Sequence, residues 1–447
     1  MKKSGFYFGP VFFSLTLVLI IVFWVASNMN WGENRWHKLL KIDGVGYYNY
    51  LPAVFIYHDL NFEFYDEVKN ENPRPELDFA FKTKTNSGII DKYYSGTAIC
   101  ISPFFLSAHL LSHISGHSTD GYSFYYLLGI QLAAFFYLIL GLMFLSLILK
   151  AYQISNWNRA LILLAVFFGS NLFYYVVHEP FMSHVYSFAF VNLFILSILN
   201  YIKARKGKWV FISAFSLGII LLIRPVNIMI LLAIPFLYGD WTTLKSVSSN
   251  LIKKTFDVIT ALLIFLAIIS IQSIIYKIQT GSFFVYSYGN EGLNLTTPHI
   301  IDFLFSYRKG FFIWAPLMFF SLLGLKSLFK NGVYKFVSWF AFILFVVYIL
   351  SSWWNWYYGG SFGSRVMIDY LAFFAIPLAL LLQKSSLRKL VVITIVVLSI
   401  FTQIQTFQYI KGYIHWSEMN SEWYWDNFLR IDKVLNGADK PWGEMHK

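Results

Sequence analysis

The chain has 447 residues, of which 57% are hydrophobic and only 13% are charged, about half of the ~25% charged residues typical of soluble domains. Long apolar blocks approach the ~20 residues that cross a bilayer. The net charge is +12, and most lysines and arginines lie in short loops between these blocks. This pattern orients membrane proteins and does not indicate nucleic-acid binding. The single Cys100 excludes an intrachain disulfide framework. We therefore predict an all-α, polytopic membrane protein with no nucleic-acid partner.

The N-terminal part predicts one span and a long outer loop. The apolar block at residues 8–27 follows Lys2 and Lys3, and we interpret it as a retained span because no small-residue cleavage site follows it. With both lysines in the cytoplasm, residues 28–121 form the first extracytoplasmic loop. The stretch Gly96–Ser115 within this loop is amphipathic, and counting it as a span would place later basic loops outside. We therefore predict a helix lying in the outer interface there.

The apolar block 207–241 decides the number of spans, because Arg224-Pro225 interrupts it. As one span it would place every later basic loop outside. As two tight spans it places most short-loop lysines and arginines inside, which the positive-inside rule favours. We therefore predict a hairpin with Arg224 at its outer turn. The resulting prediction is about eleven spans, at residues 8–27, 122–149, 158–176, 184–201, 207–223, 225–241, 255–275, 310–328, 336–352, 366–383 and 389–408.

This count makes residues 1–408 one transmembrane domain and residues 409–447 an extracytoplasmic tail rich in tryptophan and charge. The protein is expected in the cytoplasmic (inner) membrane of the cell, with a cytoplasmic N-terminus and its chemistry on the outer face.

A candidate catalytic residue, Asp43, follows the first span. Gly44 and Gly46 come next, and glycine lets the backbone turn tightly. A carboxylate held there at the membrane surface would act as a general base on a hydroxyl group, while an ordinary loop aspartate in an Asx turn is the alternative. Tyr47, just beyond, joins the candidate substrate-binding residues.

A second polar group lies between the predicted spans 158–176 and 184–201. His178, Glu179 and His184 fall within seven residues, and ionisable groups at membrane depth are costly unless they are paired or functional. They would bind a polar substrate, pair with other side chains, or hold a divalent metal, although their spacing matches no standard metal site. His109, on the predicted interfacial helix, is either structural or lines the substrate site.

Three arginines lie at the predicted outer ends of other spans. Arg224, Arg308 and Arg365 carry guanidinium groups that match phosphate oxygens and stabilise charge developing on a phosphate leaving group. Snorkelling toward lipid headgroups is the alternative for each. Trp356 belongs to an aromatic loop before Arg365. Its ring would stack on a sugar, and the glycines in the same loop argue against a simple interfacial aromatic belt.

This arrangement resembles the GT-C membrane glycosyltransferases, in particular the bacterial relatives of dolichyl-phosphate-mannose protein mannosyltransferases, over residues 1 to about 385. The resemblance rests on Asp43 after the first span, on the proline-aromatic helix at Ser102–His109, and on the arginine-bearing outer turns. Glu179 or His184 would take the family's polar position at the outer start of the fourth span. Gly44 departs from the family, because many relatives have an Asp-Glu pair in the first loop. The run 178–184 likewise replaces an acidic residue often seen before the fourth span.

The resemblance implies a GT-C-like fold and a polyprenyl-phosphate-linked sugar as donor, with its lipid between spans and its phosphosugar at the outer face. The expected reaction moves one sugar to a hydroxyl of a lipid, glycan or protein acceptor. No cofactor is certain, and a divalent metal stays an open alternative. A polysaccharide polymerase or ligase using lipid-linked oligosaccharide is the second hypothesis. The third is a non-enzymatic transporter of lipid-linked sugars, which the gathering of ionisable groups at one face disfavours.

Overall fold

The computed structural model describes residues 9–32, 35–71 and 73–438, so Lys2, Lys3 and the end of the tail lie outside the described residues. The described chain is mostly helical and has one two-stranded sheet. It divides into two compact units. Unit 1 contains Met1–Val18, Leu145–Tyr174 and Gly292–Lys447, and unit 2 contains Leu19–Phe144 and Tyr175–Glu291.

Long apolar helices agree with the prediction of a polytopic membrane protein. Among the described residues, eight helical segments are long and apolar enough to cross a bilayer. They are α1 (Pro10–Asn30), α4 (Gly96–Ile114), α5 (Phe124–Ala151), α8 (Ser183–Ala204), α12 (Thr255–Thr280), α17 (Val333–Ser351), η5 (Arg365–Tyr370) continued by α18 (Leu371–Lys384), and α19 (Arg388–Ile410). Two shorter apolar helices are α6 (Asn156–Phe168) and α9 (Gly207–Ile223). The count of eleven spans is not confirmed.

Two predicted spans, 158–176 and 310–328, are broken, and a third, 225–241, begins as a 3₁₀ helix and ends at Tyr238. Pro316 begins a new helical segment within 310–328, because proline lacks the N–H that would continue a preceding helix. Hydropathy detects the apolar composition but not these breaks. The predicted span 158–176 consists of α6 and α7 (Leu172–Val177), and the predicted span 225–241 consists of η3 (Pro225–Ala233) and α10 (Ile234–Tyr238). The predicted span 310–328 consists of α14 (Phe311–Trp314), α15 (Pro316–Ser321), η4 (Leu322–Gly324) and α16 (Leu325–Lys330).

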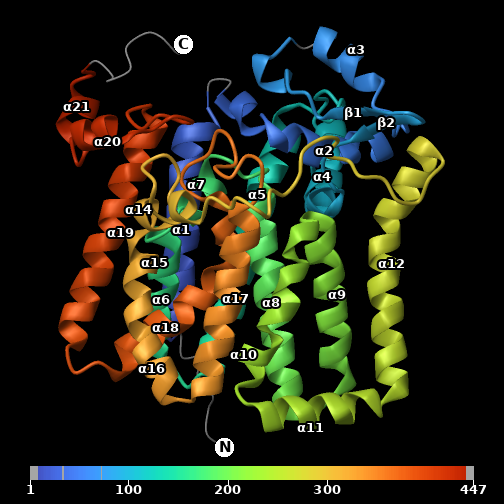
Figure 1. Cartoon of the computed structure of the whole chain (residues 1–447). Helices are drawn as coiled ribbons and strands as arrows, with labels where there is room; N and C mark the ends of the chain where they lie inside the picture. Colours follow the sequence, from blue (N-terminus) through green and yellow to red (C-terminus); the bar gives the residue numbers. More distant parts are fainter. Residues whose placement is uncertain (1–8, 33–34, 72, 439–447) are drawn as a thin grey trace, which may run out of the picture. The chain divides into compact units, whose positions relative to one another are not determined.

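In unit 2, the helices α8, α9 and α12 pack side by side, and α11 (Trp241–Ile252) crosses one end of them (Figure 1). Close packing of α9 on α12 depends on Gly218, where a Cβ would come within 2.9 Å of Ile268. The segment Pro225–Tyr238 bends by 117° into α11.

The predicted reversal at Arg224-Pro225 is confirmed. Tyr238, at the end of α10, packs in one apolar cluster with Tyr201 of α8 and with Trp209 at the start of α9. The chain therefore leaves this end along α9 and returns to it through η3 and α10. Arg224 lies at the opposite end of α9 from the basic loop 203–208.

The first loop of unit 2 is a folded layer. It contains η1 (Arg35–Leu39), α2 (Asp43–Phe55), α3 (Phe64–Glu71), η2 (Pro75–Leu77), β1 (Lys82–Thr85) and β2 (Gly88–Asp91). The strands pair antiparallel, with Lys82 opposite Asp91 and Thr85 opposite Gly88, so the all-α prediction is wrong locally. A Cβ at Gly88 would overlap the backbone of Gln279 near the end of α12, which places this layer at the end of unit 2 remote from α11.

The stretch Gly96–Ser115 forms a single helix, α4, as predicted. Gly96 abuts the backbone of Leu222 and Ile223, which holds the start of α4 against the end of α9. By length and composition α4 also qualifies as a span, so its interfacial position stays a prediction.

Unit 1 packs α18 against α6, α15 and α16. The described part of the predicted tail, residues 409–438, is folded into this unit through α20 (Ser421–Asn427) and α21 (Ile431–Leu435). Tyr424 of α20 meets Trp314 edge-on at 5.5 Å, and Gln408 donates to the carbonyl of Asn427 at 2.6 Å. Residues on both sides of position 409 therefore pack in the same unit, and a domain boundary there stays a prediction.

Candidate functional site

Asp43 is the first residue of α2 and not part of a tight turn. The role predicted for its glycines is therefore wrong. Gly44 and Gly46 are helical and buried, and a Cβ would overlap the ring of Phe181 at the first and the ring of Tyr93 at the second. The glycines let other segments approach α2, because an added side chain has no room there.

The carboxylate of Asp43 accepts a hydrogen bond of 2.8 Å from the hydroxyl of Tyr93. Tyr93 is buried, and its ring centroid lies 4.6 Å from that of Tyr47. Ile42, immediately before, has φ of 52°, a strained conformation for a β-branched residue, and such strain gathers at functional sites. Sequence reasoning missed Tyr93, because nothing local to residue 93 marks it as a partner of Asp43.

The segment 178–184 packs along the start of α2. Lys41 and Glu179 form an ion pair at 3.5 Å, and Phe181 covers Gly44. The Ser183 hydroxyl donates to the hydroxyl of Tyr47 at 3.4 Å. The structure thus brings together two segments that the sequence singled out separately.

Arg224 reaches this group from the end of α9. Its guanidinium donates to Nδ1 of the buried His184 at 3.3 Å. Burial raises the pKa of Tyr288, and the charges of Asp43 and Arg224 act on it in opposite directions, so both charges are near Tyr288. We call these contacting residues the Asp43–Arg224 cluster: Asp43, Tyr47, Tyr93, Ser183, His184 and Arg224.

His178 is a neutral imidazole at physiological pH. Burial, supported by the nearby charge of Lys41, lowers the pKa of His178 to about 3. In the part of the chain that the structure describes, no three His, Cys, Asp or Glu side chains gather closely enough to hold a metal ion. The metal alternative for His178, Glu179 and His184 therefore finds no support in this geometry.

His109 has a structural contact. Its Nδ1 lies 2.6 Å from the hydroxyl of Tyr126 on α5, and its ring is parallel to that of Phe105. This favours the structural interpretation of His109 over substrate binding.

The other predicted residues belong to unit 1. The Arg308 guanidinium lies 3.5 Å from the centre of the Tyr357 ring, and its Nε donates to the carbonyl of Ser417 at 2.6 Å. Trp356 stacks on His299 at 5.6 Å. Arg365 begins η5 and is half-buried. A single site that joins these residues to the Asp43–Arg224 cluster of unit 2 stays a prediction.

Lys309 is a buried cation that sequence reasoning missed. The side chain is 3% exposed, and its ammonium donates to the carbonyls of Ser361 and Trp416. It thereby ties the aromatic loop after α17 to the segment after α19. Its position next to Arg308 in the sequence was the available signal.

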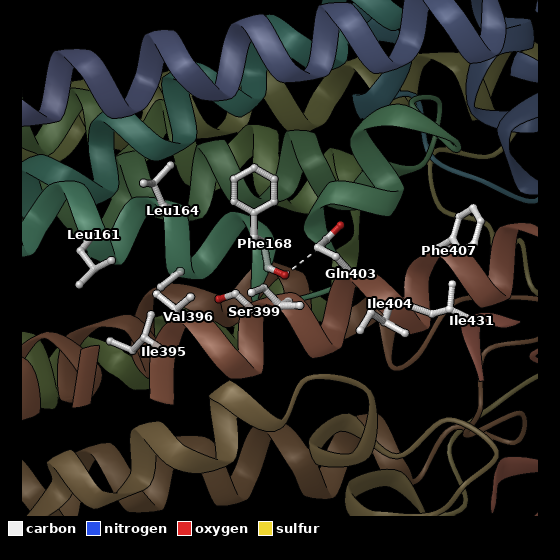
Figure 2. Close-up of a pocket in the computed structure, with 12 residues that line it drawn as sticks. Leu161, Leu164, Phe168, Ile395, Val396, Ser399, Gln403, Ile404, Phe407 and Ile431 are labelled. Atoms are coloured by element: carbon white, nitrogen blue, oxygen red, sulfur yellow. Dashed lines mark hydrogen bonds between the residues drawn. The ribbon is translucent and has the colours of Figure 1, made fainter. Parts of the chain in front are cut away.

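Unit 1 also contains a groove of about 510 Å³ between α6 and α19 (Figure 2). Its lining is almost entirely apolar, and the Gln403 amide at its edge donates to the carbonyl of Phe168 at 2.7 Å. None of its lining side chains is ionisable. It is lined by Leu161, Leu164, Ala165, Phe168, Ile395, Val396, Ser399, Ile400, Gln403, Ile404, Phe407 and Ile431.

No family model matches this chain, and no curated protein matches it.

Proposed function

We propose that the protein is a membrane glycosyltransferase that moves a sugar from a polyprenyl-phosphate carrier to an acceptor hydroxyl on the extracytoplasmic face. The observation that carries the proposal is the Asp43–Arg224 cluster. It combines a carboxylate, phenolic hydroxyls and a guanidinium at one end of unit 2. Sugar transfer from a phosphate carrier needs a base for the acceptor and a cation for the leaving phosphate.

Asp43 is the proposed general base. In the reaction, the acceptor oxygen bonds to the anomeric carbon while its proton passes to the Asp43 carboxylate. The bond between the anomeric carbon and the phosphate oxygen breaks, and the electron pair leaves with the polyprenyl phosphate. Tyr93, which donates to Asp43 at 2.8 Å, stabilises the ionised form of the base. A β-linked donor would give inversion at the anomeric centre.

Arg224 is the proposed partner of the carrier phosphate. Its contact with Nδ1 of His184 orients the guanidinium, and a fork of N–H donors matches phosphate oxygens in geometry. The end of unit 2 opposite Arg224 carries the basic residues of the loop 203–208. It also carries Lys245, Lys253 and Lys254. This separation supports an extracytoplasmic position for the Asp43–Arg224 cluster.

The test is the variant Asp43→Asn, assayed in membranes supplied with radiolabelled carrier-linked sugar. We expect loss of transfer by at least about 100-fold, in the range typical of removing a general base, at normal protein level. The matched control is Asp66→Asn, because Asp66 is an exposed residue of the same loop that pairs with Lys82. Full transfer by Asp43→Asn would remove Asp43 from the mechanism. Transfer of a labelled oligosaccharide from a larger carrier-linked donor to the acceptor would instead favour the polymerase or ligase.

A further inference from the structure

Asp91 is a buried acid that contacts Tyr93 of the Asp43–Arg224 cluster. It ends β2, and its side chain is 0% exposed. Its Oδ1 accepts the backbone N–H of Tyr93 at 2.7 Å. Its Oδ2 is also buried and has no hydrogen-bond partner among the described residues. A Cβ at Gly46 would come within 3.0 Å of Oδ1, so Asp91 lies against α2.

The surroundings of Asp91 favour its uncharged form. An ionised carboxylate that is buried without a cation is costly, and no ion pair to Asp91 occurs in the described part of the chain. Burial raises the pKa of Asp91 well above its usual value, and the N–H of Tyr93 offsets only part of this shift. The neighbouring Lys92 is engaged with Glu291 at 2.5 Å.

Tyr50 and Tyr276 also face Asp91. Both are buried, uncharged phenols that lie close enough to Asp91 to sense a charge on it. The charged and titratable groups around the Tyr93 side chain are Asp43, Tyr47 and Tyr288. None of these groups supplies a positive charge to Asp91.

The backbone around Tyr93 is held on both sides. The hydroxyl of Tyr50 donates to the carbonyl of Tyr93 at 2.7 Å, while Asp91 takes its N–H. Two residues later, the N–H of Ser95 donates to Gln272 of α12 at 2.9 Å. These hydrogen bonds hold the backbone in place on both sides of Tyr93. The Tyr93 hydroxyl in turn donates to Asp43.

We propose that Asp91 is a positioning residue, held as a neutral carboxylic acid, which fixes Tyr93 so that its hydroxyl reaches Asp43. The role in catalysis rests on the proposed function, whereas the neutral state and the effect on Tyr93 do not. Because a neutral acid does not change charge near physiological pH, the position of Tyr93 stays constant there.

Two measurements on the full-length protein in detergent test this without any transfer assay. At neutral pH, the infrared difference spectrum of the wild type minus Asp91→Asn should show the carbonyl stretch of a protonated carboxylic acid. With a single fluorotyrosine at position 93, the ¹⁹F resonance should be unchanged in Asp91→Asn, because the amide keeps an acceptor for the Tyr93 N–H. It should shift or broaden in Asp91→Ala. The control is Asp78→Asn, a surface residue paired with Lys69.

Carboxylate bands in place of the acid band would overturn the proposal, as would an unchanged ¹⁹F resonance in Asp91→Ala. In the transfer assay, Asp91→Asn should keep the wild-type pH profile, while Asp91→Ala should lose about tenfold or more, the scale of a hydrogen bond to a charged group. If the wild type transfers no sugar, the proposed function fails, and the two spectra still decide the state of Asp91. If Asp91→Ala does not fold, the infrared comparison with Asp91→Asn decides.

Discussion

The hydroxyl of Tyr93 donates a hydrogen bond of 2.8 Å to the carboxylate of Asp43, although 50 positions separate the two residues in the chain. The contact exists because β2 ends just before Tyr93 and because Gly46 leaves room for the Tyr93 ring against α2. Asp43 is thus a residue of a packed layer whose environment is set by neighbours on other elements.

Removing this hydrogen bond should change the basicity of Asp43. In Tyr93→Phe the ionised carboxylate loses a donor, so the pKa of Asp43 should rise, and the acidic limb of the pH profile of sugar transfer should move to higher pH. Transfer at neutral pH should fall about tenfold. Tyr94→Phe is the matched control, because the Tyr94 ring faces Tyr276. An unmoved acidic limb in Tyr93→Phe would contradict this prediction.

A methyl group at Gly44 should destabilise the protein. In Gly44→Ala the Cβ would overlap the ring of Phe181, and overpacking of this kind costs about 1–3 kcal/mol. Adding Phe181→Leu should recover part of the loss, because it removes the overlapping ring. Thermal unfolding in detergent measures both variants. Gly292→Ala, where a Cβ has no neighbour within 4 Å, should unfold like the wild type, and an equal loss there would show that the effect is not local.

Acid should destabilise the fold partly through His178. The pKa of His178 lies at about 3 in the folded protein, against 6.5 for an ordinary histidine. The unfolded chain therefore binds more protons between these values, so the stability from a neutral His178 is present above pH 6.5 and is lost as the pH falls toward 3. The loss is at most about 1.4 kcal/mol per pH unit.

The measurement compares unfolding temperatures at pH 7 and pH 5. The difference between the two temperatures should be smaller in His178→Gln than in the wild type, whatever the stability of the variant at pH 7. His58→Gln, at an exposed site, should leave the difference unchanged. An equal difference in His178→Gln and the wild type would show that His178 does not contribute.

Arginine at position 308 should not be replaceable by lysine. Arg308→Lys loses the Nε donor to the Ser417 carbonyl and the planar group over the Tyr357 ring. The expected cost is about 1 kcal/mol or more in stability. A double-mutant cycle with Tyr357→Leu should give a coupling of at least about 0.5 kcal/mol, and additive losses would mean that the stacking contact contributes nothing.

The two ends of unit 2 should label from opposite sides of the membrane. In a Cys100→Ser background, Asn290→Cys, beside the Lys92–Glu291 pair, should react with an impermeant maleimide in intact cells. Ser249→Cys on the exposed face of α11 should react only after permeabilisation. Labelling of both positions in intact cells would contradict the predicted orientation, and it would move the Asp43–Arg224 cluster away from the proposed extracytoplasmic site.

Features that depend on local composition can be predicted from the amino-acid sequence by itself. The long apolar helices, the single helix at Gly96–Ile114 and the reversal at Arg224-Pro225 follow from runs of apolar residues and from the proline and charge that interrupt them. Asp43, His184 and Arg224 stood out for a related reason, because a polar group beside an apolar run is costly without a partner or a function.

Only the tertiary structure decided which of these residues meet. Gly44 and Gly46 were expected to form a turn, but their lack of a Cβ serves contacts with Phe181 and Tyr93 from distant segments. Asp91 carried no sequence signal, because an aspartate at the end of a short strand looks like a surface residue until its burial is known. Hydropathy is a sum over neighbours along the chain, whereas burial, hydrogen bonding and the ionisation of an acid depend on neighbours in space. The sequence alone therefore determined a chain of apolar helices with polar ends. The packing decided that Tyr93 donates to Asp43 and that Asp91 accepts the N–H of Tyr93.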